Sequence, residues 1–212
     1  MDKETINEPL LIVISSPSGA GKSSICKKLL GLDKNLKISI SATTRSPRQN
    51  ESNSKDYHFI SKSEFNKKID NNEFAEYAQV FNNLYGSLKN DIKSLTDLGN
   101  DVIFDIDWQG TQQLAQSNSS NIVTIFVLPP SKVEIEERLR KRQTDSGDNK
   151  SLINERMSKF KDEVSHWVEY DYVVINKDLN QCSVDILGII NSERKKRHRQ
   201  KDLVNKVRDL VS

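Results

Sequence analysis

Small polar residues surround a single lysine in SSPSGAGKSS, residues 15–24, between an apolar run at 10–14 and a segment with helical periodicity. Glycines let backbone N–H groups approach an anion, and the helix that follows adds the partial positive charge of its N-terminus. Residues 16–23 match the phosphate-binding pattern GxxxxGK[ST] except at the first position, where Ser16 replaces glycine. With a strand before it and a helix after it, the stretch predicts a phosphate-binding loop rather than a plain turn.

In such a loop each side chain has a defined task. Lys22 would neutralise β- and γ-phosphate oxygens and Ser23 would ligate Mg²⁺. GTPases, motor ATPases and small-molecule kinases share the loop, and NKD at 176–178 departs by one position from the NKxD motif of GTPases. The predicted ATP-binding residues are Ser16, Pro17, Ser18, Gly19, Ala20, Gly21, Lys22, Ser23 and Ser24.

A second set of candidate ligands lies in residues 42–91. Arg45 and Arg48 offer planar forks that suit phosphate, and Tyr57 and Tyr85 add hydroxyl donors. Glu76 could accept two hydrogen bonds at once. Guanine presents that pair of donors and adenine does not, so a buried carboxylate would select guanine.

Acidic and basic side chains recur further along the chain. Asp105 and Asp107 end an apolar strand on one side of it, where parallel strands place ligand-binding groups, although a helix cap is the alternative. Arg138 and Arg142 share a helix face with apolar residues, which favours an inward role over surface ion pairs with neighbouring glutamates.

Five short runs rich in Ile and Val are expected to be strands, and they are separated by helix-length segments. This alternation predicts an α/β protein with a parallel sheet covered on both faces. The predicted strands are residues 10–14, 36–41, 101–107, 121–128 and 171–176.

Helical periodicity predicts the covering layers. We expect one helix after the glycine-rich loop that Gly31 ends, and one opened by Ser131 with Glu134 and reaching about residue 143. A longer helix has inward positions from 153 to 167, and a last one begins near 181 with Val184, Leu187 and Ile190 inward. Two segments interrupt the alternation of strands and helices. The first is residues 42–91, in which we expect a helix begun by Ser61 and a hairpin at 79–87. The second is the polar stretch 143–151, which is expected to be a loop.

Length, net charge and cysteine spacing exclude several classes of protein. A chain of 212 residues can bury one core with inserted lobes, and a net charge of +2 gives no field that would attract nucleic acid or a membrane surface. Cys26 and Cys182 lack the spacing of metal ligands, so we expect them to be reduced thiols that pack in the core. With no leader-like N-terminus and no long apolar run, a cytoplasmic protein is expected. The basic segment 193–201 is expected to be a solvated helix end.

Several motifs occur together in one order, and from about residue 10 to 176 the chain resembles guanylate kinases, which are P-loop nucleoside-monophosphate kinases. The segments that carry the resemblance are SPSGAGKSS, SATTRSPR, KDYHFI, NNEFAEYA, YGS, DIDWQG, LPPS and ERLRKR. The resemblance implies transfer of the ATP γ-phosphoryl group to GMP, and to dGMP, with Mg²⁺ in purine nucleotide metabolism. It also implies a core of residues 1–41, 92–132 and 158–212, a GMP-binding lobe at 42–91 and a lid at 133–157.

The resemblance also assigns individual roles by position. Ser41, Glu76 and Asp107 correspond to guanine-reading groups, and Ser23 and Asp105 to metal-site groups. The GMP phosphate would meet Arg45, Arg48, Tyr57 and Tyr85, with Gly86 and Ser87 beside them. The groups that would act on the transferred phosphoryl group are Lys22, Arg45, Arg138, Arg142 and Arg156.

This chain departs from the family pattern at residues 141–144, which read KRQT instead of GRGT, and in a longer following loop. Two rival interpretations remain. Domains of this type also serve as non-catalytic peptide-binding modules, but these lose phosphate-loop residues that this chain keeps. A related transferase could use another acceptor, although Glu76 with Ser41 and Asp107 favours guanine.

Overall fold

A five-stranded parallel sheet forms the centre of the computed structural model. The structure describes residues 8–48, 51–116, 121–146 and 150–212, and only the backbone is described for residues 141–146 and 150–155. The strand order is β2-β7-β1-β8-β9, and every neighbouring pair is parallel. The strands are β1 (Leu11–Ser15), β2 (Leu36–Ile38), β7 (Asp101–Asp105), β8 (Ile122–Leu128) and β9 (Tyr172–Ile175). The predicted α/β sheet is confirmed, with the second strand shorter than expected.

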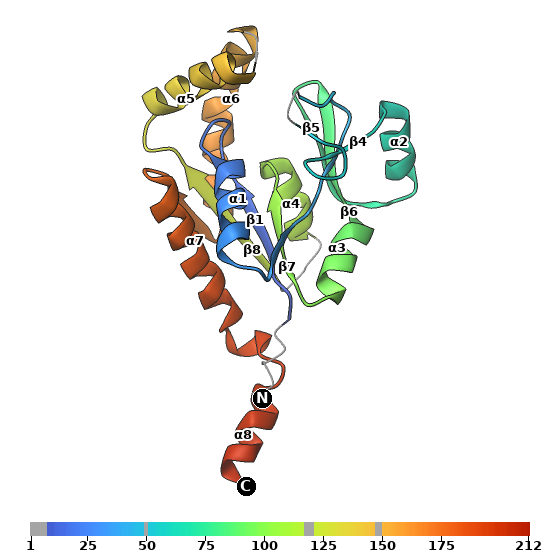
Figure 1. Ribbon diagram of the computed structural model, residues 1–212, viewed down its shortest axis with the longest axis vertical. Coiled ribbons are helices and arrows are strands. Elements are labelled where there is room, and N and C mark those ends of the chain that lie inside the picture. Colours follow the sequence, from blue (N-terminus) through green and yellow to red (C-terminus); the bar gives the residue numbers. More distant parts are fainter. Residues whose placement is uncertain (1–7, 49–50, 117–120, 147–149) are drawn as a thin grey trace.

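Helices cover both faces of this sheet, as Figure 1 shows. The side chains of Ile12 and Ile14 pack with α1 (Lys22–Leu32) and α7 (Leu179–Arg194) in one apolar cluster. Val13 points to the other face and packs in a second cluster with residues of α3 (Lys89–Asp97) and α4 (Trp108–Gln116). The alternation follows from the two-residue period of a strand and explains why β1 is apolar throughout.

A smaller four-stranded sheet, of order β4-β3-β6-β5, extends from the core. It joins β3 (Ala42–Thr43), β4 (His58–Phe59), β5 (Phe74–Val80) and β6 (Asn83–Leu88), and β5 and β6 form the predicted hairpin. Helix α2 (Lys62–Asp70) is capped by Ser61, whose Oγ accepts the Glu64 N–H at 3.1 Å. Phe65 of this helix stacks on Phe74 with ring centres 4.4 Å apart, which holds the lobe together.

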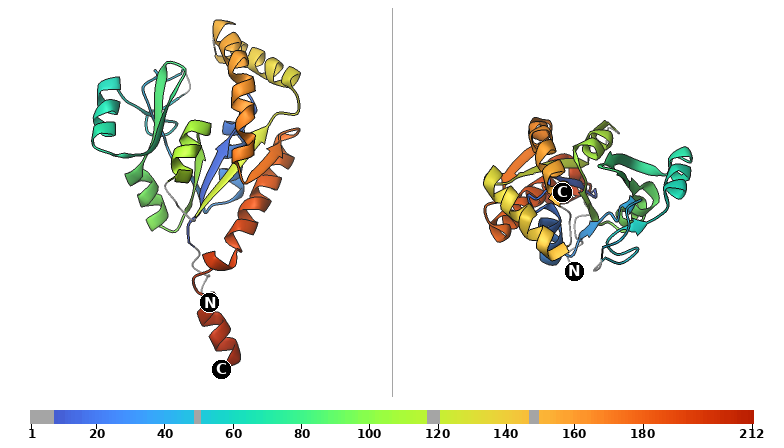
Figure 2. Two further views of the ribbon diagram at one scale, coloured as in Figure 1. Left: turned by 180° about the vertical axis from the view of Figure 1, so that it is seen from behind. Right: turned by 90° about the horizontal axis from the view of Figure 1, so that it is seen from above.

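A helical arm stands on the other side of the core from the small sheet, and both rise above the same end of the parallel strands (Figures 1 and 2). The arm contains α5 (Lys132–Ser146) and α6 (Lys150–Ser165). Ile135 and Leu139 of α5 pack against Met157 and Phe160 of α6. The prediction of a loop over 143–151 is wrong at residues 143–146 and 150–151, which are helical.

Three details of the helix predictions are wrong. Gly31 lies inside α1, which ends one residue later at Leu32. Helix α6 ends at Ser165, so Trp167 falls in the short 3₁₀ helix η1 (His166–Glu169) and is exposed. Helix α7 begins at Leu179 because the Asp178 side chain caps it. Its buried face contains Ile186 and Ile190, and Val184 faces outward.

The basic C-terminal segment is only partly solvated. Arg199, in the 3₁₀ helix η2 (Arg197–Arg199), is 3% exposed and lies 3.3 Å from the carboxylate of Glu193, which is 2% exposed. The expectation of a solvated helix end is therefore wrong at these two residues, which bury an ion pair. The last helix, α8 (Leu203–Val211), projects away from the body (Figure 1). Within the described residues no helix combines the length and apolarity needed to cross a membrane.

Candidate functional site

One cavity of about 520 Å³ lies between the phosphate loop, the small sheet and the helical arm. It collects most of the residues that the sequence singled out. Those lining it are Ser16, Pro17, Ser18, Gly19, Gly21, Lys22, Ser23, Ser24, Ser41, Arg45, Arg48, Tyr57, Glu76, Tyr85, Asp105, Asp107, Arg138 and Arg156. Ala20, Gly86 and Ser87 do not line it, and the side chain of Arg142 lies outside the described residues.

The phosphate loop needs glycine at two positions. Gly19 and Gly21 have φ angles of 90° and 98°, a region that residues with a Cβ rarely adopt. Gly21 immediately precedes α1, and Asn176 donates a hydrogen bond to the Ala20 carbonyl at 2.7 Å. A Cβ on Gly21 would lie 2.6 Å from the Asn176 amide nitrogen. The loop is therefore closely packed against the end of β9.

Lys22 and Ser23 meet the acidic end of β7. The Lys22 ammonium donates to the Ile106 carbonyl at 2.6 Å and pairs with Asp105 at 3.1 Å. Burial alone lowers the pKa of Lys22, but the Asp105 carboxylate outweighs it and the pKa is raised, so Lys22 is charged at neutral pH.

The hydroxyl of Ser23 donates to the other Asp105 oxygen at 2.7 Å. These are hard oxygen donors of the kind that Mg²⁺ prefers, so the pair fits a magnesium ion. Among the described residues no group of three or more His, Cys, Asp or Glu side chains could hold a metal ion.

Glu76 of β5 is the deepest acidic group in the cavity. It is 3% exposed, accepts the Ser87 hydroxyl at 2.6 Å, and lies against Gly110, where a Cβ would collide with its carboxylate. Burial raises the pKa of Glu76 to about 7, with a further contribution from the charge of Asp107. The Ser87 hydroxyl is therefore engaged with the Glu76 carboxylate in this structure.

The Asp107 side chain caps a helix and also lines the cavity. One carboxylate oxygen accepts the Gly110 N–H at 3.1 Å and the other accepts the Gln109 side chain at 3.1 Å, so Asp107 caps α4. The same side chain also lines the cavity beside Glu76. The helix-cap alternative is thus present together with a position from which Asp107 could reach a ligand.

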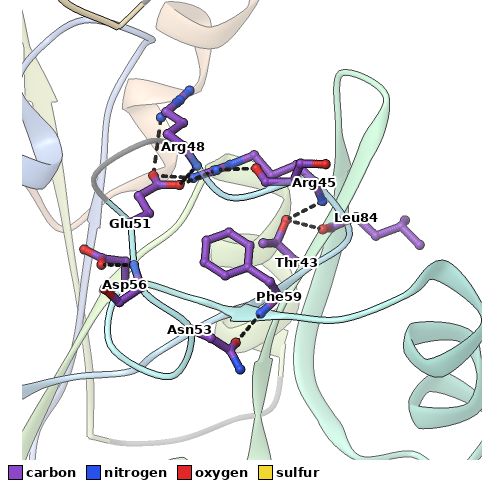
Figure 3. A network of polar contacts seen from close by, with 10 residues as sticks. Thr43, Arg45, Arg48, Glu51, Asn53, Asp56, Phe59 and Leu84 are labelled. Atoms are coloured by element: carbon purple, nitrogen blue, oxygen red, sulfur yellow. Dashed lines mark hydrogen bonds and ion pairs between the residues drawn. The ribbon is translucent and has the colours of Figure 1, made fainter.

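Two arginines and two tyrosines form the part of the cavity nearest the β3–β4 loop. The guanidinium of Arg45 lies 4.9 Å from the ring centre of Tyr57, and the Tyr57 and Tyr85 rings meet edge to face at 6.0 Å. Both arginines contact Glu51, a residue that the sequence analysis did not identify (Figure 3). The cluster presents positive charge and hydroxyl donors on one wall.

The helical arm contributes further groups. Arg138 pairs with Glu134 at 2.5 Å and also donates a hydrogen bond to the Ala20 carbonyl at 3.4 Å. Arg138 therefore forms the ion pair with a neighbouring glutamate and also points inward. Arg156 is buried, with its guanidinium 6.0 Å from the ring centre of Phe81 in the β5–β6 turn. Glu163 accepts the Ser18 N–H at 2.9 Å, and burial raises its pKa.

Sequence reasoning missed four residues of this region. Asn176 carries the best signal, since it directly follows a predicted strand at the end where ligands bind. Glu163 lies seven positions after Arg156, on the same helix face. Glu51 and Phe81 lie in a polar loop and a hairpin turn, where no periodicity marks them.

The family model that describes guanylate kinases matches residues 8–193. The chain belongs to the guanylate kinase family. A guanylate kinase of Paramagnetospirillum magneticum is 47% identical over 201 residues, covering 95% of this chain and 92% of that protein. One of Rickettsia bellii is 47% identical over 194 residues, covering 92% of this chain and all of the relative.

A solved guanylate kinase from Anaplasma phagocytophilum superposes with a TM-score of 0.76 at 33% identity, covering 94% of this chain and 93% of that one. These likenesses confirm the resemblance and the P-loop kinase fold. The chain is therefore an ATP:GMP phosphotransferase, with ATP as co-substrate and Mg²⁺ as the metal. The two rival interpretations are thereby set aside.

Proposed function

We propose that three parts of the chain divide the guanylate kinase reaction between them. The core, residues 1–41, 92–132 and 158–212, binds ATP through the phosphate loop. The lobe at 42–91 binds GMP or dGMP, and the lid at 133–157 brings arginines to the transferred group. All three parts contribute to one cavity, which is the observation that carries the proposal.

Both boundaries of the lid and the second boundary of the lobe fall within helices. Helix α6 continues from the lid into the core, and α3 continues from the lobe into the core. Each moving part is thus joined to the core by a helix, which suits rigid-body closure. Small-angle scattering with and without a bisubstrate analogue tests this division, because identical profiles would contradict closure.

For ATP, we assign Lys22 to the β- and γ-phosphates and the loop amides to the phosphate chain. Ser23 would ligate Mg²⁺, and Asp105 would hold its water ligands. When bound, the ion neutralises charge on the phosphates. The 2.7 Å contact between Ser23 and Asp105 supports this pairing.

For GMP, we assign Glu76 to the N1–H and amino group of guanine, aided by Ser41 and Asp107. Arg45, Arg48, Tyr57 and Tyr85 take the phosphate. The burial of Glu76 supports the first assignment, because an unpaired buried carboxylate against adenine costs about 1–3 kcal/mol or more. Gly86 is needed for packing, since its Cβ would lie 2.8 Å from the Phe74 ring.

The acceptor atom is an oxygen of the GMP phosphate, whose second ionisation lies near pH 6, so it needs no general base. The oxygen attacks the γ-phosphorus of ATP while the bond to the bridging β–γ oxygen breaks. Catalysis then consists of alignment and of charge neutralisation by Lys22, Arg45, Arg138, Arg142 and Arg156.

A direct test compares Lys22→Ala with Lys27→Ala, which removes an exposed lysine from the same helix. We expect Lys22→Ala to lower kcat by about 100-fold or more, the scale found when one such donor is removed. Lys27→Ala should match the parent. ADP release is measured with GMP, dGMP, AMP, CMP and UMP, and normal turnover of Lys22→Ala would refute the phosphate-loop assignment.

A further inference from the structure

Glu51 makes a two-point contact with Arg45. One carboxylate oxygen accepts from Nη1 at 2.5 Å and the other accepts from Nη2 at 2.7 Å, so two parallel charge-assisted bonds join the side chains. Both groups are largely shielded from solvent, with side-chain exposures of 12% for Arg45 and 16% for Glu51. Solvent screening is correspondingly weak, and the pair fixes the plane of the Arg45 guanidinium.

The same carboxylate also contacts Arg48. The Glu51 Oε2 atom accepts the Arg48 backbone N–H at 2.9 Å, and Oε1 lies 3.7 Å from Arg48 Nη1. In return, the Glu51 backbone N–H donates to the Arg48 carbonyl at 3.0 Å. One of these bonds is made by the side chain and the other by the backbone, and together they anchor Glu51 to Arg48 within the loop. One carboxylate therefore bridges both arginines, as Figure 3 shows.

Glu51 lies behind the arginines with respect to the cavity. Arg45 and Arg48 line the cavity, whereas Glu51 does not. The hydrogen bond from Arg45 lowers the pKa of Glu51, so the carboxylate is ionised at neutral pH. A guanidinium has five N–H donors, so Arg45 can bind Glu51 on one edge and still offer donors to a phosphate on another.

The two guanidinium groups would repel each other without a negative charge between them, and each would lose side-chain freedom on binding phosphate. Glu51 offsets both costs before the substrate arrives. Arg45 is held further by a bond from Nη1 to the Ser46 carbonyl at 3.0 Å and by the Tyr57 ring. The arginines are thus oriented in the substrate-free protein.

We propose that Glu51 is a positioning residue that orients Arg45 and Arg48 toward the phosphate of GMP. The proposal rests on the function proposed above for these two arginines. Glu51 would contact the arginines and not the nucleotide, so its contribution should depend entirely on the phosphate group of the ligand.

The test replaces Glu51 by Gln, which keeps the shape of the side chain and removes its charge. We expect the Kd for GMP to rise about 10- to 100-fold, the range for losing charge-assisted hydrogen bonds. The Kd for guanosine, which lacks the phosphate, and the KM for ATP should stay within about twofold. Glu73→Gln serves as the control, because Glu73 pairs with Lys68 in the same lobe and does not line the cavity.

Unchanged GMP affinity in Glu51→Gln, or tighter GMP binding, would overturn the proposal. An equal loss of guanosine and GMP affinity would also overturn it, since that pattern reports damage to the whole lobe. If Glu51→Gln does not fold, Glu51→Asp, which is too short to bridge both arginines, gives the same comparison.

A double-mutant cycle with Arg45→Ala separates this proposal from the one on which it rests. If Glu51 acts through Arg45, adding Glu51→Gln to Arg45→Ala should weaken GMP binding by much less than it does alone. Additive losses would contradict positioning. If Arg45→Ala itself does not weaken GMP more than guanosine, the phosphate assignment fails instead.

Discussion

The guanine-binding role proposed for the buried carboxylate of Glu76 predicts that GMP binding depends on pH. Burial raises its pKa from 4.5 to about 7, so the free enzyme loses the ionised form as pH falls through neutrality. Guanine offers two donors, and only the ionised carboxylate can accept both. We therefore expect kcat/KM for GMP to fall about tenfold from pH 8 to pH 6, following the protonated fraction.

The same shift affects stability with the opposite sign. A carboxyl group whose pKa is raised on folding destabilises the folded state as pH rises from 4.5 to about 7. This rise in the pKa of Glu76 corresponds to a loss of about 3 kcal/mol in the free energy of unfolding, because one pKa unit equals about 1.4 kcal/mol. Glu76→Gln should therefore gain stability relative to the parent as pH rises, by up to about 3 kcal/mol at pH 8.

The assay measures initial rates against GMP at several pH values for the parent and for Glu76→Gln. GMP itself ionises near pH 6, but this affects both proteins equally and cancels in their ratio. A ratio of kcat/KM values that stays flat from pH 6 to pH 8 would refute the reasoning. Urea unfolding at pH 4.5 and pH 8 measures the predicted change in stability. If the two proteins differ in free energy of unfolding by the same amount at both pH values, the result would count against the raised pKa.

Two further substitutions test packing. Gly21→Ala places a Cβ against Asn176 at a positive φ angle, which costs about 1–3 kcal/mol, and should raise the KM for ATP more than that for GMP. Gly31→Ala, in open space on helix α1, which directly follows Gly21, is the control and should leave rates unchanged. Glu193→Ala leaves Arg199 buried without its partner and should lower the free energy of unfolding by about 3–5 kcal/mol. Urea denaturation measures this loss, and a change below about 1 kcal/mol would contradict a buried pair.

The parallel sheet was predictable because its central strands β7, β1 and β8 are buried on both faces. Such strands read as continuous apolar runs, and this explains why residues 101–105 and 122–128 were found. The phosphate loop was predictable because its chemistry demands glycine and lysine at fixed spacing. Both signals are local in the sequence, so one chain segment is enough to reveal them.

Residues that act through tertiary contacts gave no such signal. Glu51 is one acidic residue in a polar loop, and only the folded loop places its carboxylate against Arg45. Composition likewise predicts a solvated segment at 193–201, because like charges in sequence are usually exposed. The turn at 197–199 instead brings Arg199 back onto Glu193 and the hydroxyl of Tyr172 donates to that carboxylate.

Three of the cations that line the cavity share one arrangement. Lys22 pairs with Asp105, Arg45 with Glu51, and Arg138 with Glu134, each through a carboxylate from the protein. These pairings keep the cations charged and oriented in a partly buried space, where isolated charges would be strongly disfavoured. Because lysine and arginine carry several donors, each can keep its carboxylate and still bind a phosphate oxygen. If these side chains take the phosphate-binding roles proposed above, the fold places the positive charge for phosphoryl transfer before either nucleotide binds.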